Sequence, residues 1–164
     1  MEKTNVMRIL DQKKIPYEAY TYPHEDGTCV DGSHVAKLLG QDPKKVFKTL
    51  VAMGTSKHYC VFVIPVEQEL DLKKSAKAVN EKAVELIPVK DLLHITGYIR
   101  GGCGPIGMKK CFKTIVDQSA LELNTIIISA GKIGYQVKLS PIHLSKLLPI
   151  EFAEITREIS MNAL

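Results

Sequence analysis

The sequence predicts an α/β fold in which a mixed β-sheet is surrounded by short helices. Short apolar runs with strand character are mixed with short segments of helical periodicity. The two kinds of segment follow no regular βαβ rhythm, which favours a mixed sheet with helices packed around it. We expect a single domain over residues 1–157, followed by a frayed tail at residues 158–164.

Local signals mark the first elements. Thr4 is a suitable N-cap for a first helix, which should end near Lys14, before Ile15 and Pro16. The next segments are expected to form a strand at 17–22, a polar turn at 24–28, a short helix closed by Gly40 and a turn opened by Asp42 and Pro43.

The middle of the chain contains the clearest strand signal. Residues 46–53 and 58–65 are apolar and are separated by a short turn, so they predict a strand pair. Residues 70–79 predict an amphipathic helix with Leu72, Ala76 and Val79 facing inward. Pro88 then suits the first turn of a helix that ends at Gly97.

The C-terminal part is expected to be rich in strands. Its predicted elements are strands at 112–116, 125–129 and 135–139, a short helix that begins at Ser140 and Pro141, and an edge strand at 151–155.

Composition excludes several classes of function. Among 164 residues 45% are hydrophobic and 24% are charged, which is typical of a soluble globular domain. The net charge is +4, but the only arginines are Arg8, Arg100 and Arg157, so the arginine-rich surface of a sequence-specific DNA reader is absent. The lysine clusters are most simply solvated faces, and they also suit contact with an RNA backbone. The apolar runs are too short to cross a membrane.

The cysteines and histidines argue against metal and cofactor chemistry. The four cysteines form no C-x-x-C pair, and the five histidines have no metal-ligand spacing. We therefore expect no metal and no cofactor. Free cysteines fit a reducing cytoplasm, which is the expected location.

Residues 96–107 are the most informative segment, because they contain five glycines and one proline. Such a segment costs backbone entropy, and it is tolerated where main-chain atoms approach a ligand closely. It does not match the P-loop or dinucleotide patterns. Gly101, Gly102, Cys103, Gly104 and Pro105 are therefore candidates for a binding loop made of backbone, although a simple connector remains an alternative.

Lys48 interrupts an apolar strand pattern between Phe47 and Thr49. A lysine at this position either faces solvent or lines a pocket. In a pocket, where we expect it to lie opposite the glycine loop, its charge would stabilise negative charge that develops in a transition state. A Ser-His-Asp or Cys-His site cannot be judged from sequence, but no G-x-S-x-G segment is present. Tyr22 and Ser129 lie at strand ends, where they would either bind a substrate or pack.

The chain resembles the YbaK family of bacterial Cys-tRNA(Pro) deacylases over nearly its whole length. The resemblance rests on segments 4–5, 15–17, 21–22, 46–50, 70–74, 96–98, 101–107 and 129–132, in the same order. It implies a mixed, strongly curved sheet surrounded by short helices, as in the related editing domain of prolyl-tRNA synthetase. The loop has Gly104 where the family commonly has serine, and Ile133 stands where arginine is common.

The resemblance also implies a function. Such an enzyme removes cysteine from misacylated Cys-tRNA(Pro), because a synthetase pocket rejects an amino acid of similar size only weakly. By this similarity Lys48 matches the essential lysine, the loop from Gly101 holds the aminoacyl group, and Tyr22, Phe47, Thr49 and Ser129 surround the pocket. The family mechanism is substrate-assisted, since the cysteine thiol attacks its own ester to give a thiolactone.

Three alternatives remain open at the level of sequence. The chain is a Cys-tRNA(Pro) deacylase, a deacylase for another misacylated tRNA, or a module that binds aminoacyl groups or tRNA without catalysis. The resemblance names misacylated tRNA as the main partner and raises prolyl-tRNA synthetase as a second one.

Overall fold

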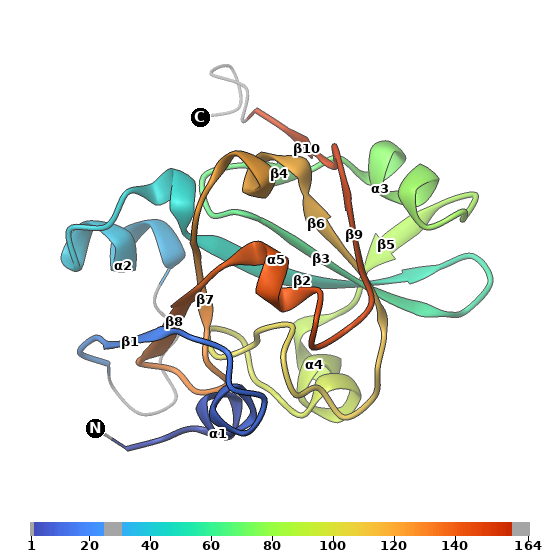
Figure 1. The fold of residues 1–164 in the computed structure, drawn as a ribbon. Helices are drawn as coiled ribbons and strands as arrows, with labels where there is room; N and C mark the ends of the chain where they lie inside the picture. The colour runs from blue at the N-terminus through green and yellow to red at the C-terminus, as the bar shows by residue number, and fades with distance from the viewer. Residues whose placement is uncertain (1, 25–30, 159–164) are drawn as a thin grey trace.

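The largest sheet of the protein has five strands, and β3 (Tyr59–Pro65) lies at its centre (Figure 1). The structure is a computed structural model that describes residues 2–24 and 31–158. The strand order in this sheet is β5-β2-β3-β6-β9. Strand β3 pairs antiparallel with β2 and parallel with β6, so the sheet is mixed. The other four strands are β2 (Phe47–Gly54), β5 (Val84–Leu86), β6 (Lys113–Asp117) and β9 (Ile150–Ala153).

A second, antiparallel sheet has the order β1-β8-β7. Its strands are β1 (Glu18–Thr21), β7 (Ile126–Ser129) and β8 (Tyr135–Leu139). One parallel bridge, between Val46 and Ile127, joins this sheet to the first residues of β2. A separate pair consists of β4 (Glu69–Leu70) and β10 (Thr156–Arg157).

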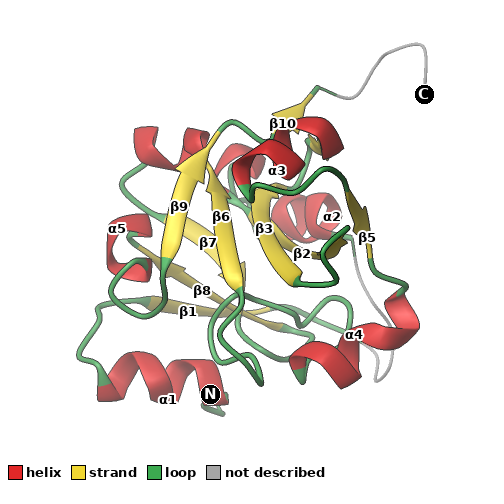
Figure 2. Ribbon diagram, turned by 90° about the vertical axis from the view of Figure 1, so that its right-hand side faces the viewer, coloured by secondary structure: helices red, strands yellow, loops and turns green. Residues whose placement is uncertain are grey.

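Short helices surround the sheets (Figures 1 and 2). The α-helices are α1 (Asn5–Gln12), α2 (Gly32–Leu38), α3 (Leu72–Ala78), α4 (Val89–Thr96) and α5 (Pro141–Leu144), and two 3₁₀ helices span Pro43–Lys45 and Gln118–Glu122. Among the described residues, no helix is long and apolar enough to cross a bilayer.

The alternation of side chains along β2 divides the interior into two cores. Phe47 and Val51 belong to the larger core, which also contains α1, β7 and the glycine loop. Ala52 belongs to a smaller core with Ala76 of α3 and Phe62 of β3. Consecutive side chains of a strand point to opposite faces, so this division follows from the strand itself.

The structure confirms the predicted fold class and most of the predicted elements. Thr4 caps α1 by accepting a hydrogen bond from the Met7 N–H, and Gly97 ends α4 in the left-handed conformation. One inward residue was predicted wrongly, because Leu72 is 45% exposed. The buried residues of α3 are Ser75 and Ala76, and Leu72, one turn before them, is the first residue of the helix.

Some predicted features lie wholly or partly outside the described residues. Only His24 of the predicted turn at 24–28, and only Glu158 of the predicted tail at 158–164, belong to the described part of the chain. The limits of the domain stay a prediction. Strands β4, β5 and β10 were not predicted, since they contain two or three residues each and show no alternation.

Asp117 ties the C-terminal segment to β6, and its removal should destabilise the fold. Its buried carboxylate accepts hydrogen bonds from the Ser119 N–H, the Ile155 N–H and the Thr156 hydroxyl. Asp117→Ala leaves these donors without a partner, so we expect the free energy of unfolding in urea to fall by about 2 kcal/mol or more. Glu122→Ala, an exposed control in the adjacent 3₁₀ helix, should change it by less than about 0.5 kcal/mol. Equal effects of the two substitutions would show that the Asp117 carboxylate does not hold the C-terminal segment in place.

Candidate functional site

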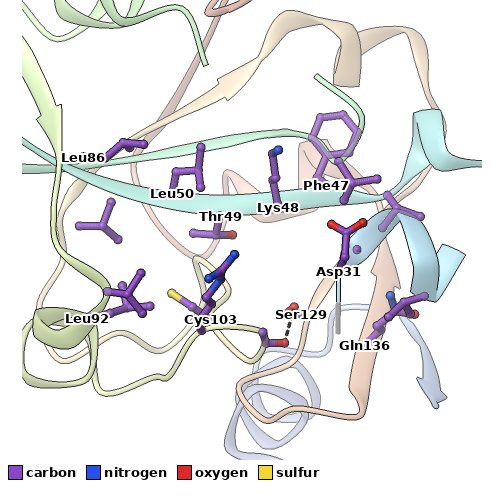
Figure 3. Close-up of a pocket in the computed structure, with 18 of the residues that line it drawn as sticks. Asp31, Phe47, Lys48, Thr49, Leu50, Leu86, Leu92, Cys103, Ser129 and Gln136 are labelled. Carbon is purple, nitrogen blue, oxygen red and sulfur yellow. Dashed lines mark hydrogen bonds between the residues drawn. The ribbon is translucent and has the colours of Figure 1, made fainter. Parts of the chain in front are cut away.

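A cavity of about 430 Å³ lies beside strand β2 (Figure 3). Its walls come from β2, the start of α2, the segment from β5 into α4, the glycine loop and the ends of β7 and β8. Seven of the residues singled out in the sequence line it, and they come from distant parts of the chain: Tyr22, Phe47, Lys48, Thr49, Gly101, Cys103 and Ser129.

The cavity forms where one edge of β2 has no neighbouring strand. On one side β2 pairs with β3 along its whole length, from Phe47 to Met53. On the other side β5 pairs only with Ala52 to Gly54, and the Ile87 N–H bonds to the Val51 carbonyl. In the described parts of the chain, no strand covers this edge between Phe47 and Leu50. Side chains on both faces of β2 therefore reach the same cavity.

Lys48 lines the cavity but does not point at the glycine loop. Figure 3 shows that Lys48 leaves β2 on the side opposite to Thr49, and that Thr49 points toward Cys103. This differs from the arrangement expected from the sequence, in which the lysine faced the glycine segment. The reason is the strand alternation, which sends Lys48 to the face of β2 opposite to Phe47 and Thr49.

The surroundings of Lys48 disfavour its charged form. The side chain is half-buried, and this desolvation lowers the pKa of its amine below the ordinary lysine value. The carboxylates of Asp31 and Glu69 oppose this shift but do not cancel it. The amine makes no salt bridge with any residue in the ranges 2–24 and 31–158. It is therefore a cation whose charge is only partly compensated.

The glycine loop is held firmly at both ends. The Tyr98 hydroxyl donates to the Ile106 carbonyl across the loop at 2.7 Å. The Ser129 hydroxyl donates to the Gly101 carbonyl at 3.3 Å, which joins the loop to the end of β7. Gly101 has a φ of +89°, a conformation that favours glycine. The loop therefore presents a fixed stretch of backbone to the cavity.

Three predicted contact residues support the loop but do not line the cavity. Gly102 is buried against the backbone of residues 132–133, and a Cβ on Gly104 would lie 2.3 Å from the Ser129 carbonyl oxygen. Pro105 lines a second cavity, of about 250 Å³. The backbone as it stands thus leaves no room for a serine at position 104. Ile133, at the position where the family commonly has arginine, is buried.

Cys103 is poorly suited to act as a nucleophile. It is buried, and this burial raises the pKa of its thiol to about 11, so the thiol stays protonated near neutral pH.

Within the described ranges, no group of three or more His, Cys, Asp or Glu side chains could hold a metal ion.

Thr49 carries an unused hydrogen-bonding group into the cavity region. Its buried hydroxyl has no hydrogen-bond partner among the residues that the structure describes. A buried hydroxyl without a partner is unfavourable, and a bound ligand would satisfy it. Among the described residues that line the cavity, Thr49 is the only one with a buried side-chain polar atom that lacks a partner.

Three charged or amide side chains at the site were missed in the sequence: Asp31, Arg100 and Gln136. Gln136 is buried in β8 and accepts a hydrogen bond from the Gln41 amide at 2.9 Å. Its sequence pattern does not single it out, because Gln136 and Lys138 alternate with apolar residues along β8, as solvent-facing residues of a strand do. Asp31 and Arg100 are exposed and belong to no motif, so only the fold shows that they share a cavity.

Comparison with known proteins gives consistent results. Residues 28–147 match the model of the aminoacyl-tRNA editing domain. EbsC of Enterococcus faecalis, named provisionally as a Cys-tRNA(Pro)/Cys-tRNA(Cys) deacylase, is 47% identical, and the match covers 94% of each chain. A proline–tRNA ligase of Endomicrobium trichonymphae is 28% identical over 83% of this chain, which spans 23% of that enzyme.

The fold also matches a solved structure. A crystal structure described as a proposed trans-editing enzyme for prolyl-tRNA synthetase has a TM-score of 0.78 and 18% identity. The match covers 95% of this chain and 99% of that one. At this identity the likeness concerns the fold alone.

The lowered pKa of Lys48 has a consequence for stability. Near neutral pH the folded state carries the partly desolvated ammonium, whereas the unfolded chain carries a fully hydrated one. Lys48→Met should therefore be more stable than the wild type at pH 7. As pH rises through the lowered pKa, Lys48 loses its proton in the folded wild type before it does so in the unfolded chain, so the free energy of unfolding of the wild type rises. The difference in this free energy between Lys48→Met and the wild type therefore narrows.

Urea unfolding between pH 7 and pH 10 measures this difference. Lys73→Met, on the exposed side of α3, is the control, and it should show no such narrowing. A Lys48→Met protein that is less stable than the wild type at pH 7 would show that the lysine stabilises the fold.

Proposed function

Because the chain belongs to the aminoacyl-tRNA editing domain family, we propose that it is a trans-editing deacylase that removes cysteine from misacylated Cys-tRNA(Pro). One observation carries the proposal to this site. Lys48, Gly101 and Ser129 come from distant segments and line one cavity, together with a buried Thr49 hydroxyl that has no partner in the described chain. The 47% identity to EbsC over 94% of both chains supports the choice of substrate.

The chemistry of the cavity suits a reaction in which the substrate supplies the nucleophile. The only thiol among the described lining residues is Cys103, which stays protonated near neutral pH. A cysteinyl ester carries its own thiol beside the ester carbonyl, which gives that thiol a high effective concentration. The protein then has to hold the reactive conformer and stabilise charge.

The proposed reaction has two steps. The substrate sulfur forms a bond to the ester carbonyl carbon, the bond from that carbon to the ribose oxygen breaks, and the thiol proton passes to this oxygen. The products are free tRNA and a cysteine thiolactone, which water then opens to cysteine. Selectivity follows from the thiol, because the serine hydroxyl is a far weaker nucleophile and alanine has none.

Each part of the site has a proposed role. The Lys48 ammonium orients the anionic end of the tRNA. Because the amine leaves β2 opposite to Thr49, the bound ester has to lie along the edge of β2 for this charge to stabilise the departing oxygen. The backbone from Gly101 and the Thr49 hydroxyl hold the aminoacyl ester. Tyr22, Phe47 and Ser129 limit the size of the pocket. We further propose that the protein acts in the cytoplasm, where prolyl-tRNA synthetase would supply the recognition of tRNA identity.

Removal of the Lys48 charge should abolish most of the activity without unfolding the protein. We expect Lys48→Ala to reduce kcat/KM for Cys-tRNA(Pro) by about 100-fold or more, the size of effect seen when a group that stabilises transition-state charge is removed. Ester loss from labelled Cys-tRNA(Pro) measures this rate. The matched control, Lys73→Ala, should keep the wild-type rate, and undiminished turnover by Lys48→Ala would contradict the proposed role.

The identity of the amino acid is tested with a panel of misacylated tRNAs. Wild-type protein should release cysteine from tRNA(Pro) faster than serine or alanine, because a thiol attacks the ester far faster than a hydroxyl does and alanine has no side-chain nucleophile. Faster release of another amino acid would replace the proposed substrate. Binding of every aminoacyl-tRNA without ester loss would show a non-catalytic module.

A further inference from the structure

Residues 97–108 form a closed loop between α4 and β6. The two ends of the loop meet where the Lys109 N–H donates to the Thr96 carbonyl at 3.0 Å. In the first half of the loop, Gly101 and Cys103 line the cavity beside β2, whereas residues 105–108 line the second cavity. Whatever holds this loop in place therefore also fixes the backbone that the first cavity presents to a ligand.

The Tyr98 side chain packs between this loop and the turn at residues 130–134. Tyr98 is buried. A Cβ on Gly107 would lie 2.6 Å from the Tyr98 hydroxyl oxygen, and a Cβ on Gly131 would lie 3.1 Å from the ring atom Cε1. Two segments that are distant in the sequence thus close on the same ring, and a side chain at position 107 would collide with it.

The Tyr98 hydroxyl is the only hydrogen-bond donor to the Ile106 carbonyl among the described residues, at a distance of 2.7 Å. Ile106 is itself buried. Burial raises the pKa of the Tyr98 phenol, so this group keeps its proton and stays a donor near neutral pH. A buried carbonyl without a donor is unfavourable, and the conformation of the loop therefore depends on this one hydroxyl.

Thr96 holds the backbone of Tyr98 against the end of α4. Its hydroxyl donates to the Leu92 carbonyl at 2.8 Å and accepts a hydrogen bond from the Tyr98 N–H at 3.0 Å. Thr96 is fully buried. Hydrogen bonds thus run from the helix through Thr96 to Tyr98, and from Tyr98 across the loop to Ile106.

Neither Thr96 nor Tyr98 lines either of the two cavities. A ligand beside β2 therefore meets the loop backbone and not these side chains. Figure 3 shows that Thr49 points toward Cys103 of the loop, so a shift of the loop would change the space between the Thr49 hydroxyl and the loop.

We propose that Tyr98 is a positioning residue for the deacylation, because its hydrogen bond to the Ile106 carbonyl holds the backbone from Gly101 to Cys103 where it receives the ester. This inference rests on the proposed function. A misplacement of about 1 Å at a reacting centre can cost about 100-fold in rate, even when the altered residue lies far from the chemistry. The loop meets only the aminoacyl end of a much larger substrate, so its displacement should affect the chemical step more than binding.

Tyr98→Phe tests this role, because it keeps the ring and removes only the hydroxyl. We expect kcat for Cys-tRNA(Pro) to fall about tenfold, while KM changes by less than about twofold. Thermal unfolding of each variant gives a temperature at which all of them are folded, and the rates are measured there. Tyr17→Phe is the matched control, since the Tyr17 hydroxyl donates to the Asp11 carboxylate at 3.0 Å on the segment between α1 and β1. It should keep the wild-type kcat.

A pair of substitutions at Thr96 tests the same hydrogen-bond chain without altering Tyr98. Thr96→Ser keeps the hydroxyl and should keep kcat close to that of the wild type. Thr96→Val has nearly the same shape but leaves the Tyr98 N–H without a partner, so it should lower kcat in the same way as Tyr98→Phe. If Tyr98→Phe does not fold, this pair decides the outcome.

Two further measurements separate positioning from a loss of overall stability. Asp117→Ala, which destabilises the fold at the C-terminal segment, should keep the wild-type kcat at a temperature where it is folded. Hydrogen exchange of the Gly102 amide, which donates to the Ile99 carbonyl at 3.0 Å within the loop, reports opening of the loop itself. Exchange at this amide should be about tenfold faster in Tyr98→Phe and unchanged in Tyr17→Phe.

The outcomes distinguish this inference from the proposed function. An unchanged kcat in folded Tyr98→Phe, or an equal loss of kcat in Asp117→Ala, would overturn the positioning role even if the protein deacylates Cys-tRNA(Pro). A wild-type protein that releases no cysteine would reject the deacylase. The exchange of the Gly102 amide then decides alone: unchanged exchange in Tyr98→Phe would overturn the role of Tyr98 in holding the loop, and faster exchange would support it.

Discussion

The unpaired edge of strand β2 is the constraint on which the site depends. Strand β3 covers one edge of β2 completely, while β5 covers the other edge only beyond Val51. An unpaired strand edge inside a protein leaves room beside the backbone, and here the glycine loop, α2 and α4 close that room into a cavity. Because consecutive side chains point to opposite faces, Lys48 and Thr49 contribute different chemistry to the same space.

The site combines stabilising and destabilising features. Tyr98 and Ser129 hold the glycine loop through hydrogen bonds to backbone carbonyls, so the loop does not have to be ordered when a substrate binds. Lys48 and Thr49, by contrast, keep a partly desolvated charge and an unpartnered hydroxyl. Groups of this kind lower stability in the free protein, and they gain partners only from a ligand. The larger core around Phe47 and Val51 supplies the packing that tolerates them.

The sequence was sufficient to predict the local elements and the segments that form the site. The cap at Thr4, the hairpin of β2 and β3 and the end of α4 at Gly97 all follow from short-range signals, and the structure contains them. Lys48 and the glycine loop each interrupt an apolar pattern, and this interruption predicts that they belong to the site. Two-residue strands such as β4 were missed, because so few residues carry no pattern.

The remaining features depend on tertiary packing. The direction of the Lys48 side chain depends on which face of β2 meets each core, and the sequence does not reveal this. Gly104 and Pro105 belong to the loop in sequence, but packing against Ser129 and the second cavity takes them away from the site. Asp31 reaches the cavity only through the placement of α2.

A structure of the protein with cysteinyl-3′-amino-3′-deoxyadenosine bound tests the central claim most directly. Our account predicts that this molecule lies along the unpaired edge of β2, with its carbonyl close to Thr49. A molecule bound elsewhere, for example in the second cavity beside Pro105, would contradict the assignment of this edge as the functional site.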